Sequence, residues 1–172
     1  MSSRIIPVQP FDYVVFGATG DLTKRKLIPA LYHRFMDGQF DEQSRIIGVS
    51  RSKLSDAEFQ KLAGDAVDQF VEKDYQDAAV IKRFLTIFSY VVNDVSDKSG
   101  WGDIKKALRD DPDVVRAFYL AVAPDLFEPI ELVNEGGVVP RLLGELQHAG
   151  KQLGTDGILK FREAHDKLVD HG

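Results

Sequence analysis

Apolar residues in the first half of the chain follow two spacings, one typical of strands and one typical of helices. Short runs rich in β-branched and aromatic residues, at 13–16 and 45–51, predict two buried strands. Between them, apolar side chains recur every three or four positions from Leu27 to Met36, which predicts a helix that packs through one face. Strand, helix and strand in this order form a parallel crossover unit.

The next stretch repeats the same alternation of elements. Ser55 and Glu58 have the spacing of a capping box, and the apolar stripe that follows predicts a second helix as far as residue 71. A shorter helical piece is expected at 78–84. Residues 85–92, LTIFSYVV, are β-branched and aromatic, so they predict a third strand.

The second half begins regularly and then changes character. An amphipathic helix is expected at 101–108, and a fourth strand at 114–122 follows a proline-containing break. From Glu131 onward, glycines and prolines punctuate short apolar pieces. We expect loop and two helices there, at 139–146 and 157–169.

Composition narrows the class of protein. A chain of 172 residues with 44% hydrophobic content is the size of one ordinary domain, and we assign 1–130 to that domain and 131–172 to a divergent helical tail on it. A net charge of −5 argues against nucleic-acid binding, and the absence of cysteine excludes disulfides and thiolate metal sites. The sequence has neither a signal-peptide core nor a membrane-length apolar run, so we expect a cytoplasmic protein with a small-molecule ligand and neither membrane nor metal.

A turn containing two glycines, Gly17-Ala18-Thr19-Gly20, separates the first strand from the first helix. A helix that begins just after a buried strand presents free backbone N–H groups and the positive end of its dipole, and glycine lets a pyrophosphate approach them. The spacing therefore predicts a dinucleotide site. Two glycines are also ordinary turn chemistry, and the third glycine of the full fingerprint is missing, so on spacing alone a purely structural turn stays open.

The end of the second strand carries cations. A site for the unphosphorylated cofactor usually has an acidic residue at this place, whereas a 2′-phosphate needs a cation. This chain has Ser50 and Arg51 there, with Lys53 two residues on. A guanidinium can hold the phosphate bidentately, which favours NADP, although a solvated Arg51 is the alternative.

Three consecutive cations, Lys24-Arg25-Lys26, open the first helix. Charge runs are usually solvated faces. Cations at a helix start oppose the dipole, however, and an anionic ligand would account for them.

Residues 17–32, GATGDLTKRKLIPALY, closely resemble the N-terminal cofactor-binding signature of glucose-6-phosphate dehydrogenases. The alternation of strands and helices predicts a Rossmann-like α/β fold, with a parallel sheet in the order third, second, first, fourth strand and helices on both faces. The resemblance places Lys26 beside cofactor and substrate, and it supports Arg51 as a cofactor contact. The other cofactor contacts it implies are Gly17, Thr19, Gly20, Asp21, Leu22 and Ser50. For Asp21, a first-turn carboxylate that stabilises the helix is a sufficient structural role.

The same resemblance covers the end of the fourth strand and stops near residue 130. Ala123 and Pro124 match a family segment whose backbone passes beside the cofactor, although a buried strand with a proline stop is an equal alternative. The family's catalytic histidine string and its Glu-Lys-Pro motif are absent, so no catalytic residue is assigned.

The resemblance implies an oxidoreductase of the pentose phosphate route that oxidises glucose 6-phosphate to the lactone with NADP. Because the family's proteins are much longer, we expect this chain to correspond to their NADP-binding portion and to be inactive alone. A catalytically empty NADP-binding module and a truncated remnant that binds nothing are the alternatives. A fragment, a truncated gene and a fusion stay open as its origin, and so does the oligomeric state.

Overall fold

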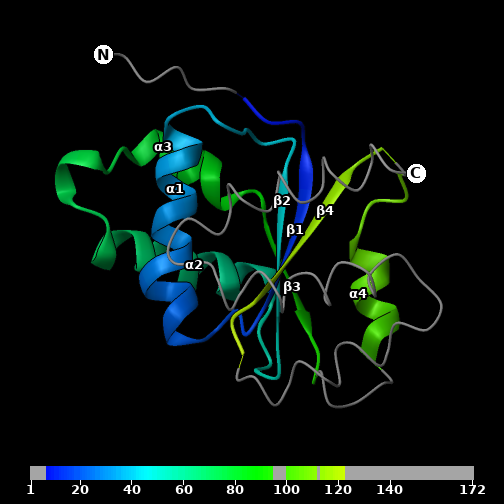
Figure 1. Cartoon of the computed structure of the whole chain (residues 1–172). Helices are drawn as coiled ribbons and strands as arrows, with labels where there is room; N and C mark the ends of the chain where they lie inside the picture. The colour runs from blue at the N-terminus through cyan, green and yellow to red at the C-terminus, as the bar shows by residue number, and fades with distance from the viewer. Residues whose placement is uncertain (1–6, 95–99, 112, 123–172) are drawn as a thin grey trace, which may run out of the picture. The chain divides into compact units, whose positions relative to one another are not determined.

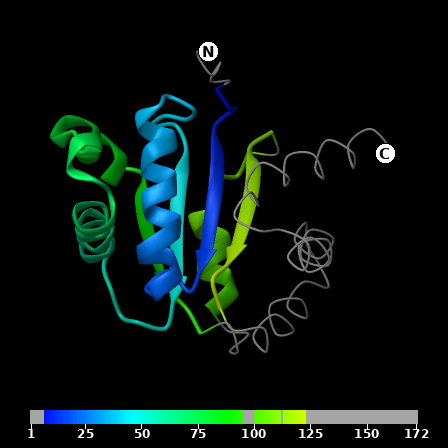
Figure 2. The ribbon, with the colours of Figure 1, turned by 60° about the vertical axis from the view of Figure 1, so that its left-hand side comes forward.

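Four parallel strands form one sheet in the order β3-β2-β1-β4, which confirms the predicted order (Figure 1). In the computed structural model the strands are β1 (Phe11–Phe16), β2 (Arg45–Ser50), β3 (Phe88–Val92) and β4 (Val115–Leu120). The cyan β2, the blue β1 and the yellow-green β4 lie side by side in Figure 2. The structure describes residues 7–94, 100–111 and 113–122, all of which belong to one compact unit, Met1–Phe127.

Helices cover both faces of this sheet, as expected, with α1, α2 and α3 on one side and α4 on the other (Figure 1). The helical elements are η1 (Thr23–Leu27), α1 (Ile28–Met36), α2 (Asp56–Phe70), η2 (Lys73–Tyr75), α3 (Ala78–Leu85) and α4 (Trp101–Ala107). The predicted capping box is present, because the Ser55 hydroxyl accepts the Glu58 N–H while the Glu58 carboxylate accepts the Ser55 N–H. The hydrogen bonds that the Glu58 carboxylate accepts from the Ser55 N–H and from the Ser55 hydroxyl lower the pKa of Glu58.

The two faces of the sheet divide the apolar side chains between them. Tyr13 and Val15 of β1 belong to the main core with the helices α1, α2 and α3. Phe59 of α2 packs against Phe88 of β3 in this core, with 5.7 Å between ring centroids. On the opposite face Phe16 contacts Trp101 of α4. Successive side chains of β1 therefore point to opposite faces of the sheet and pack against helices on both sides. β1 is the strand that ends at the glycine turn.

The predicted start of the third strand is wrong. The third strand does not begin at residue 85, because Leu85 is the last residue of α3 and β3 begins at Phe88. The Asp77 carboxylate caps α3 by accepting the N–H groups of Ala79 and Val80, and the helix then runs its full two turns. The turn that follows contains Thr86, whose β-branched side chain made it resemble a strand residue.

A buried ion pair joins distant segments at the amino end of β1. Asp12 is fully buried, and its carboxylate accepts both the Arg109 Nε–H and the Arg109 backbone N–H at 2.8 Å. The same guanidinium donates to the Gln43 carbonyl at 2.5 Å. Arg109 therefore fixes the entry to β4 against β1 and against the residues that lead into β2, at the end of the sheet away from the glycine turn.

Two side chains of α2 also bind the backbone of β3. The Asp56 carboxylate accepts the Tyr90 N–H at 2.7 Å, and the Gln60 amide donates to the Phe88 carbonyl at 3.0 Å. These bonds fix the first turn of α2 against β3.

Other sequence predictions concern residues that the structure does not describe. The helices expected at 139–146 and 157–169 lie outside the described residues, and the assignment of 131–172 as a separate tail stays a prediction. Within the described part of the chain, no helix combines the length and the apolar character needed to cross a membrane.

Candidate dinucleotide-binding site

The turn after β1 is built around Gly17, which has a left-handed φ of +77°. Its N–H donates to the Val49 carbonyl at 2.9 Å, and its carbonyl accepts the Gly20 N–H at 2.9 Å and the Thr23 hydroxyl at 3.0 Å. A Cβ at this position would lie 2.2 Å from the Ala121 carbonyl oxygen. Glycine is therefore required here by the backbone itself, since both the φ and the neighbouring strand exclude a side chain.

Gly20 is less tightly enclosed than Gly17. A Cβ there would lie 3.1 Å from the Gly17 oxygen, which is a tight contact, and 4.0 Å from the Ala121 oxygen. Apart from its neighbours in the chain, no other heavy atom of the described residues would lie within 4 Å of that Cβ. The Gly20 carbonyl accepts the Lys24 N–H at 3.2 Å and so begins the helical turn. Among the described residues, little else stands between a ligand and the backbone beside Gly20.

The first helix begins irregularly. Its first five residues, Thr23–Leu27, form a π-helical turn in which the Ile28 N–H bonds the Thr23 carbonyl. Such turns occur mostly as single insertions in α-helices and are frequent at functional sites. Here the turn carries all three of the predicted cations.

Among the described residues, one of those cations has an ion-pair partner. Arg25 donates to the exposed Asp21 carboxylate at 2.6 Å and lies over the Phe70 ring, 5.4 Å from its centroid. Lys24 and Lys26 have no ion pair within the part of the chain that the structure describes. Asp21 thus stabilises the first helical turn as a partner of Arg25, while the two lysines remain available to an anion.

The apolar side chain of Leu22 is 48% exposed at the same helix start. An exposed leucine beside a glycine turn gives the site an apolar edge. Together the turn and the helix start offer backbone N–H groups, lysine charge and apolar surface in one place.

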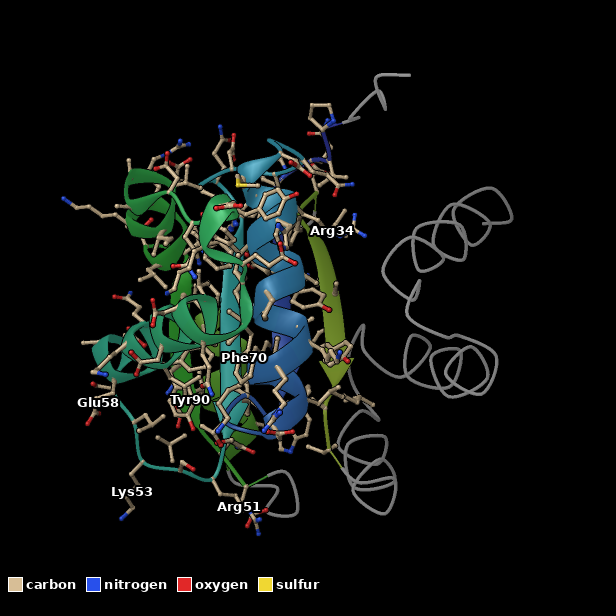
Figure 3. All side chains as sticks on the ribbon, turned by 90° about the vertical axis from the view of Figure 1, so that its left-hand side faces the viewer. Arg34, Arg51, Lys53, Glu58, Phe70 and Tyr90 are labelled. Carbon is tan, nitrogen blue, oxygen red and sulfur yellow. The ribbon has the colours of Figure 1, made fainter. Side chains whose placement is uncertain are left out.

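The loop that leaves β2 carries Arg51 and Lys53, and both project away from the sheet in Figure 3. Both side chains are exposed. Neither has an ion pair among the described residues. Because the Gly17 N–H bonds the Val49 carbonyl, this loop and the glycine turn emerge from adjacent strand ends.

Hydroxyl groups link the ends of three strands at this place. The Tyr90 hydroxyl donates to the Ser52 carbonyl at 2.8 Å and lies 2.6 Å from the Ser50 Oγ, which in turn lies 3.1 Å from the Thr19 Oγ1. Partial burial raises the pKa of Tyr90, and the Ser50 hydrogen bond acts against that rise without cancelling it. The phenol is therefore protonated at neutral pH and acts as a donor.

The structure brings seven of the predicted site residues together at one end of the sheet, and Lys26 lies in the helical turn that follows. The seven are Gly17, Thr19, Gly20, Asp21, Leu22, Ser50 and Arg51. Ala123 and Pro124 lie outside the described residues, although Ala121, two residues before Ala123, borders Gly17.

Sequence reasoning missed Tyr90 as a residue of this site. Its place near the end of a predicted strand was the only signal available. Among the residues the structure describes, no three His, Cys, Asp or Glu side chains gather in a way that could hold a metal ion.

A parallel sheet in the order 3-2-1-4, with a glycine turn leading from its first strand into a helix, defines a Rossmann-like dinucleotide-binding domain. Comparison with protein families agrees: residues 14–140 match the family model described as "Glucose-6-phosphate dehydrogenase, NAD binding domain". The chain belongs to the glucose-6-phosphate dehydrogenase family.

Two curated relatives illustrate the match. The glucose-6-phosphate 1-dehydrogenase of Rhizobium meliloti (strain 1021) is 52% identical over 99% of this chain, which corresponds to 37% of the relative. That of Gluconobacter oxydans (strain 621H) is 43% identical over 72% of this chain and 26% of the relative. The chain therefore spans about a third or less of the curated relatives it matches.

Solved structures give the same result for the fold. A glucose-6-phosphate dehydrogenase in complex with its substrate glucose-6-phosphate is similar with a TM-score of 0.63 and 28% identity, over 77% of this chain and 28% of the other. The glucose-6-phosphate 1-dehydrogenase from Mycobacterium avium is similar with a TM-score of 0.64 and 27% identity, over 72% of this chain and 26% of the other.

Proposed function

We propose that this site binds NADP in preference to NAD, and that the chain supplies the NADP-binding portion of an enzyme that oxidises glucose 6-phosphate to the lactone. The observation that carries the proposal is the exposed cation pair of Arg51 and Lys53 at the end of β2. This is the place where the ribose 2′ substituent of a dinucleotide lies in Rossmann folds.

The electrostatics of the loop support a phosphate there. The first two carboxylates after the strand are already engaged, Asp56 with the Tyr90 N–H and Glu58 with the Ser55 N–H and hydroxyl. Both carboxylates are held in the first turn of α2, and residues 50–53 at the end of β2, where NAD-selective sites place their acidic residue, include no carboxylate. A doubly charged 2′-phosphate gains charge-assisted hydrogen bonds from the Arg51 guanidinium, whereas a hydroxyl does not.

The glycine turn takes the other charged part of the cofactor in this proposal. The open space beside Gly20 lets a pyrophosphate approach the start of the first helix, whose N–H groups and dipole favour an anion. Lys26, exposed and without an ion pair among the described residues, adds charge beside the bound phosphates or a phosphorylated sugar. The assignment of glucose 6-phosphate rests on family membership, because none of the described residues is assigned as the base that accepts the proton of the sugar hydroxyl.

Titration of the purified chain with NADP and with NAD, followed by fluorescence or calorimetry, tests the proposal. NADP should bind more tightly, and Arg51→Ala should weaken NADP by about 1.5–3 kcal/mol, or roughly 10- to 150-fold, while leaving NAD almost unchanged. Arg45→Ala is the matched control, since Arg45 is equally exposed but lies at the opposite end of β2. Equal affinity of the unaltered chain for the two cofactors would refute the preference for NADP.

The same samples, supplied with glucose 6-phosphate, test the assignment of the reaction. The 172-residue chain by itself should bind cofactor without forming NADPH, because turnover also needs a positioned base. NADPH formation that depends on glucose 6-phosphate and disappears in Lys26→Ala would show that a base within this chain had been overlooked.

A further inference from the structure

We propose that Tyr90 is a positioning residue that determines cofactor specificity, because it holds both ends of the loop that carries Arg51 and Lys53. The inference rests on the proposed function, since it assumes that this loop receives the 2′-phosphate. Tyr90 itself need not touch the cofactor.

The Tyr90 side chain fixes the start of the loop. Its hydroxyl donates to the Ser52 carbonyl at 2.8 Å and lies 2.6 Å from the Ser50 Oγ. These two residues flank Arg51 directly. The Ser50 hydroxyl before the arginine and the Ser52 carbonyl after it are therefore both hydrogen-bonded to one phenol on the neighbouring strand.

The Tyr90 backbone fixes the end of the same loop. Its N–H donates to the carboxylate of Asp56, the first residue of α2, at 2.7 Å. Ser55, one residue earlier, is held in turn by the capping box. The loop of residues 51–55 thus runs between two anchors that belong to a single residue of β3.

The hydrogens in this cluster have only one consistent arrangement. Tyr90 gives its single proton to the Ser52 carbonyl, so the Ser50 hydroxyl must donate to the Tyr90 oxygen. Ser50 then accepts from the Thr19 hydroxyl at 3.1 Å and from the Ser52 N–H at 3.3 Å. Every position on the Ser50 hydroxyl is occupied, so this side chain links the glycine turn to the loop and has no donor left for a ligand.

Removal of the phenol hydroxyl should leave the packing of Tyr90 intact. The ring lies against Phe59, with 5.1 Å between centroids, and this contact does not involve the hydroxyl. Tyr90→Phe therefore keeps the aromatic contact and the backbone bond to Asp56 while releasing the Ser50 hydroxyl before Arg51 and the Ser52 carbonyl after it.

Titration of Tyr90→Phe with NADP and with NAD tests this inference. Without the phenol hydroxyl the arginine loop is held less firmly, and it must become ordered when NADP binds. Affinity for NADP should therefore fall by about 3- to 10-fold, which corresponds to one hydrogen bond, while affinity for NAD changes less than about twofold. Tyr75→Phe is the control, because Tyr75 is 51% exposed in η2, outside this hydroxyl cluster. Thermal unfolding of each variant confirms that the fold is kept.

A double variant identifies the route of the effect. If Tyr90 acts through the arginine, Tyr90→Phe should change NADP affinity by less than about twofold once Arg51→Ala is present. An equal loss for NADP and NAD, or an undiminished loss in the Arg51→Ala background, would overturn the inference. Unchanged NADP binding in Tyr90→Phe would overturn it as well, and would leave the proposed function standing if Arg51→Ala alone removes the preference.

Discussion

A comparison of Gly17 with Gly38 separates two free-energy costs of a side chain at Gly17, the unfavourable φ and the collision with a neighbouring segment. Both residues have a left-handed φ, +77° and +75°. Apart from its neighbours in the chain, no heavy atom of the described residues lies within 4 Å of a Cβ at Gly38, whereas a Cβ at Gly17 would lie 2.2 Å from the oxygen and 2.8 Å from the carbon of the Ala121 carbonyl. Alanine at either position pays for the unfavourable φ, but only at Gly17 does it also collide with a strand.

The expected magnitudes follow from those contacts. A left-handed conformation costs a non-glycine residue about 1–2 kcal/mol, so Gly38→Ala should lower the free energy of unfolding by that amount. At Gly17 the colliding atoms are backbone, which cannot rotate away as a side chain would, and overpacking of this kind adds about 1–3 kcal/mol. Gly17→Ala should therefore cost about 2–5 kcal/mol, a large share of the roughly 5–15 kcal/mol available to a domain.

Urea unfolding of the two alanine variants and the parent chain, followed by circular dichroism, measures both terms. The transition midpoint should fall more for Gly17→Ala, with the slope of the transition unchanged. The difference between the two variants isolates the contact with Ala121. If Gly17→Ala were no more destabilising than Gly38→Ala, the close approach of β4 to the turn, and with it the structural explanation of this glycine, would be wrong.

Three further predictions concern ligand space, the buried ion pair and pH. Gly20→Val should abolish binding of NADP and NAD in the same titrations, because the added side chain occupies ligand space, while the fold is kept, since the Cβ needs only a small shift away from the Gly17 oxygen at 3.1 Å; retained affinity would mean that Gly20 serves only the turn. Arg109→Met should lower the free energy of unfolding in urea by about 3 kcal/mol, since it leaves the buried Asp12 carboxylate without its cation, and a loss below about 1 kcal/mol would contradict this. The hydrogen bond from Arg83 lowers the pKa of Glu42 from 4.5 to about 2, so this pair stabilises the fold above pH 4.5 and loses its effect as the pH falls towards 2. Glu42→Gln should therefore lower the melting temperature by less than about 3 °C at neutral pH, because the pair is exposed, and its melting curve should merge with that of the parent near pH 2; a constant difference across this range would contradict the assignment.

The sequence was sufficient to predict the sheet because its signals are local. The capping-box spacing of Ser55 and Glu58 predicts the start of α2 from only four residues. The alternation of apolar runs predicts the parallel strands and their order. The beginning of β3 was misplaced for the same reason. Thr86 has the composition of a strand residue, but the cap supplied by Asp77 sets the length of the preceding helix and delays the strand.

The site was predicted only as far as its residues are consecutive in the chain. Gly17 and Gly20 were both assigned to the turn, but their different constraints depend on Ala121, a hundred residues away. The bond between Ser50 and Tyr90 joins positions 40 apart, and nothing in either segment indicates it. Contacts of this kind follow from the register of neighbouring strands, which a single sequence does not specify.

The contacts between α2 and β3 also decide where this sheet can grow. A strand at the edge of a sheet normally offers a row of free N–H and C=O groups to any extended segment. Here the Asp56 carboxylate accepts the Tyr90 N–H, and the Gln60 amide donates to the Phe88 carbonyl. A new strand could therefore pair with β3 at these residues only by displacing α2. An additional strand, whether from this polypeptide or from another, would therefore join the sheet beside β4.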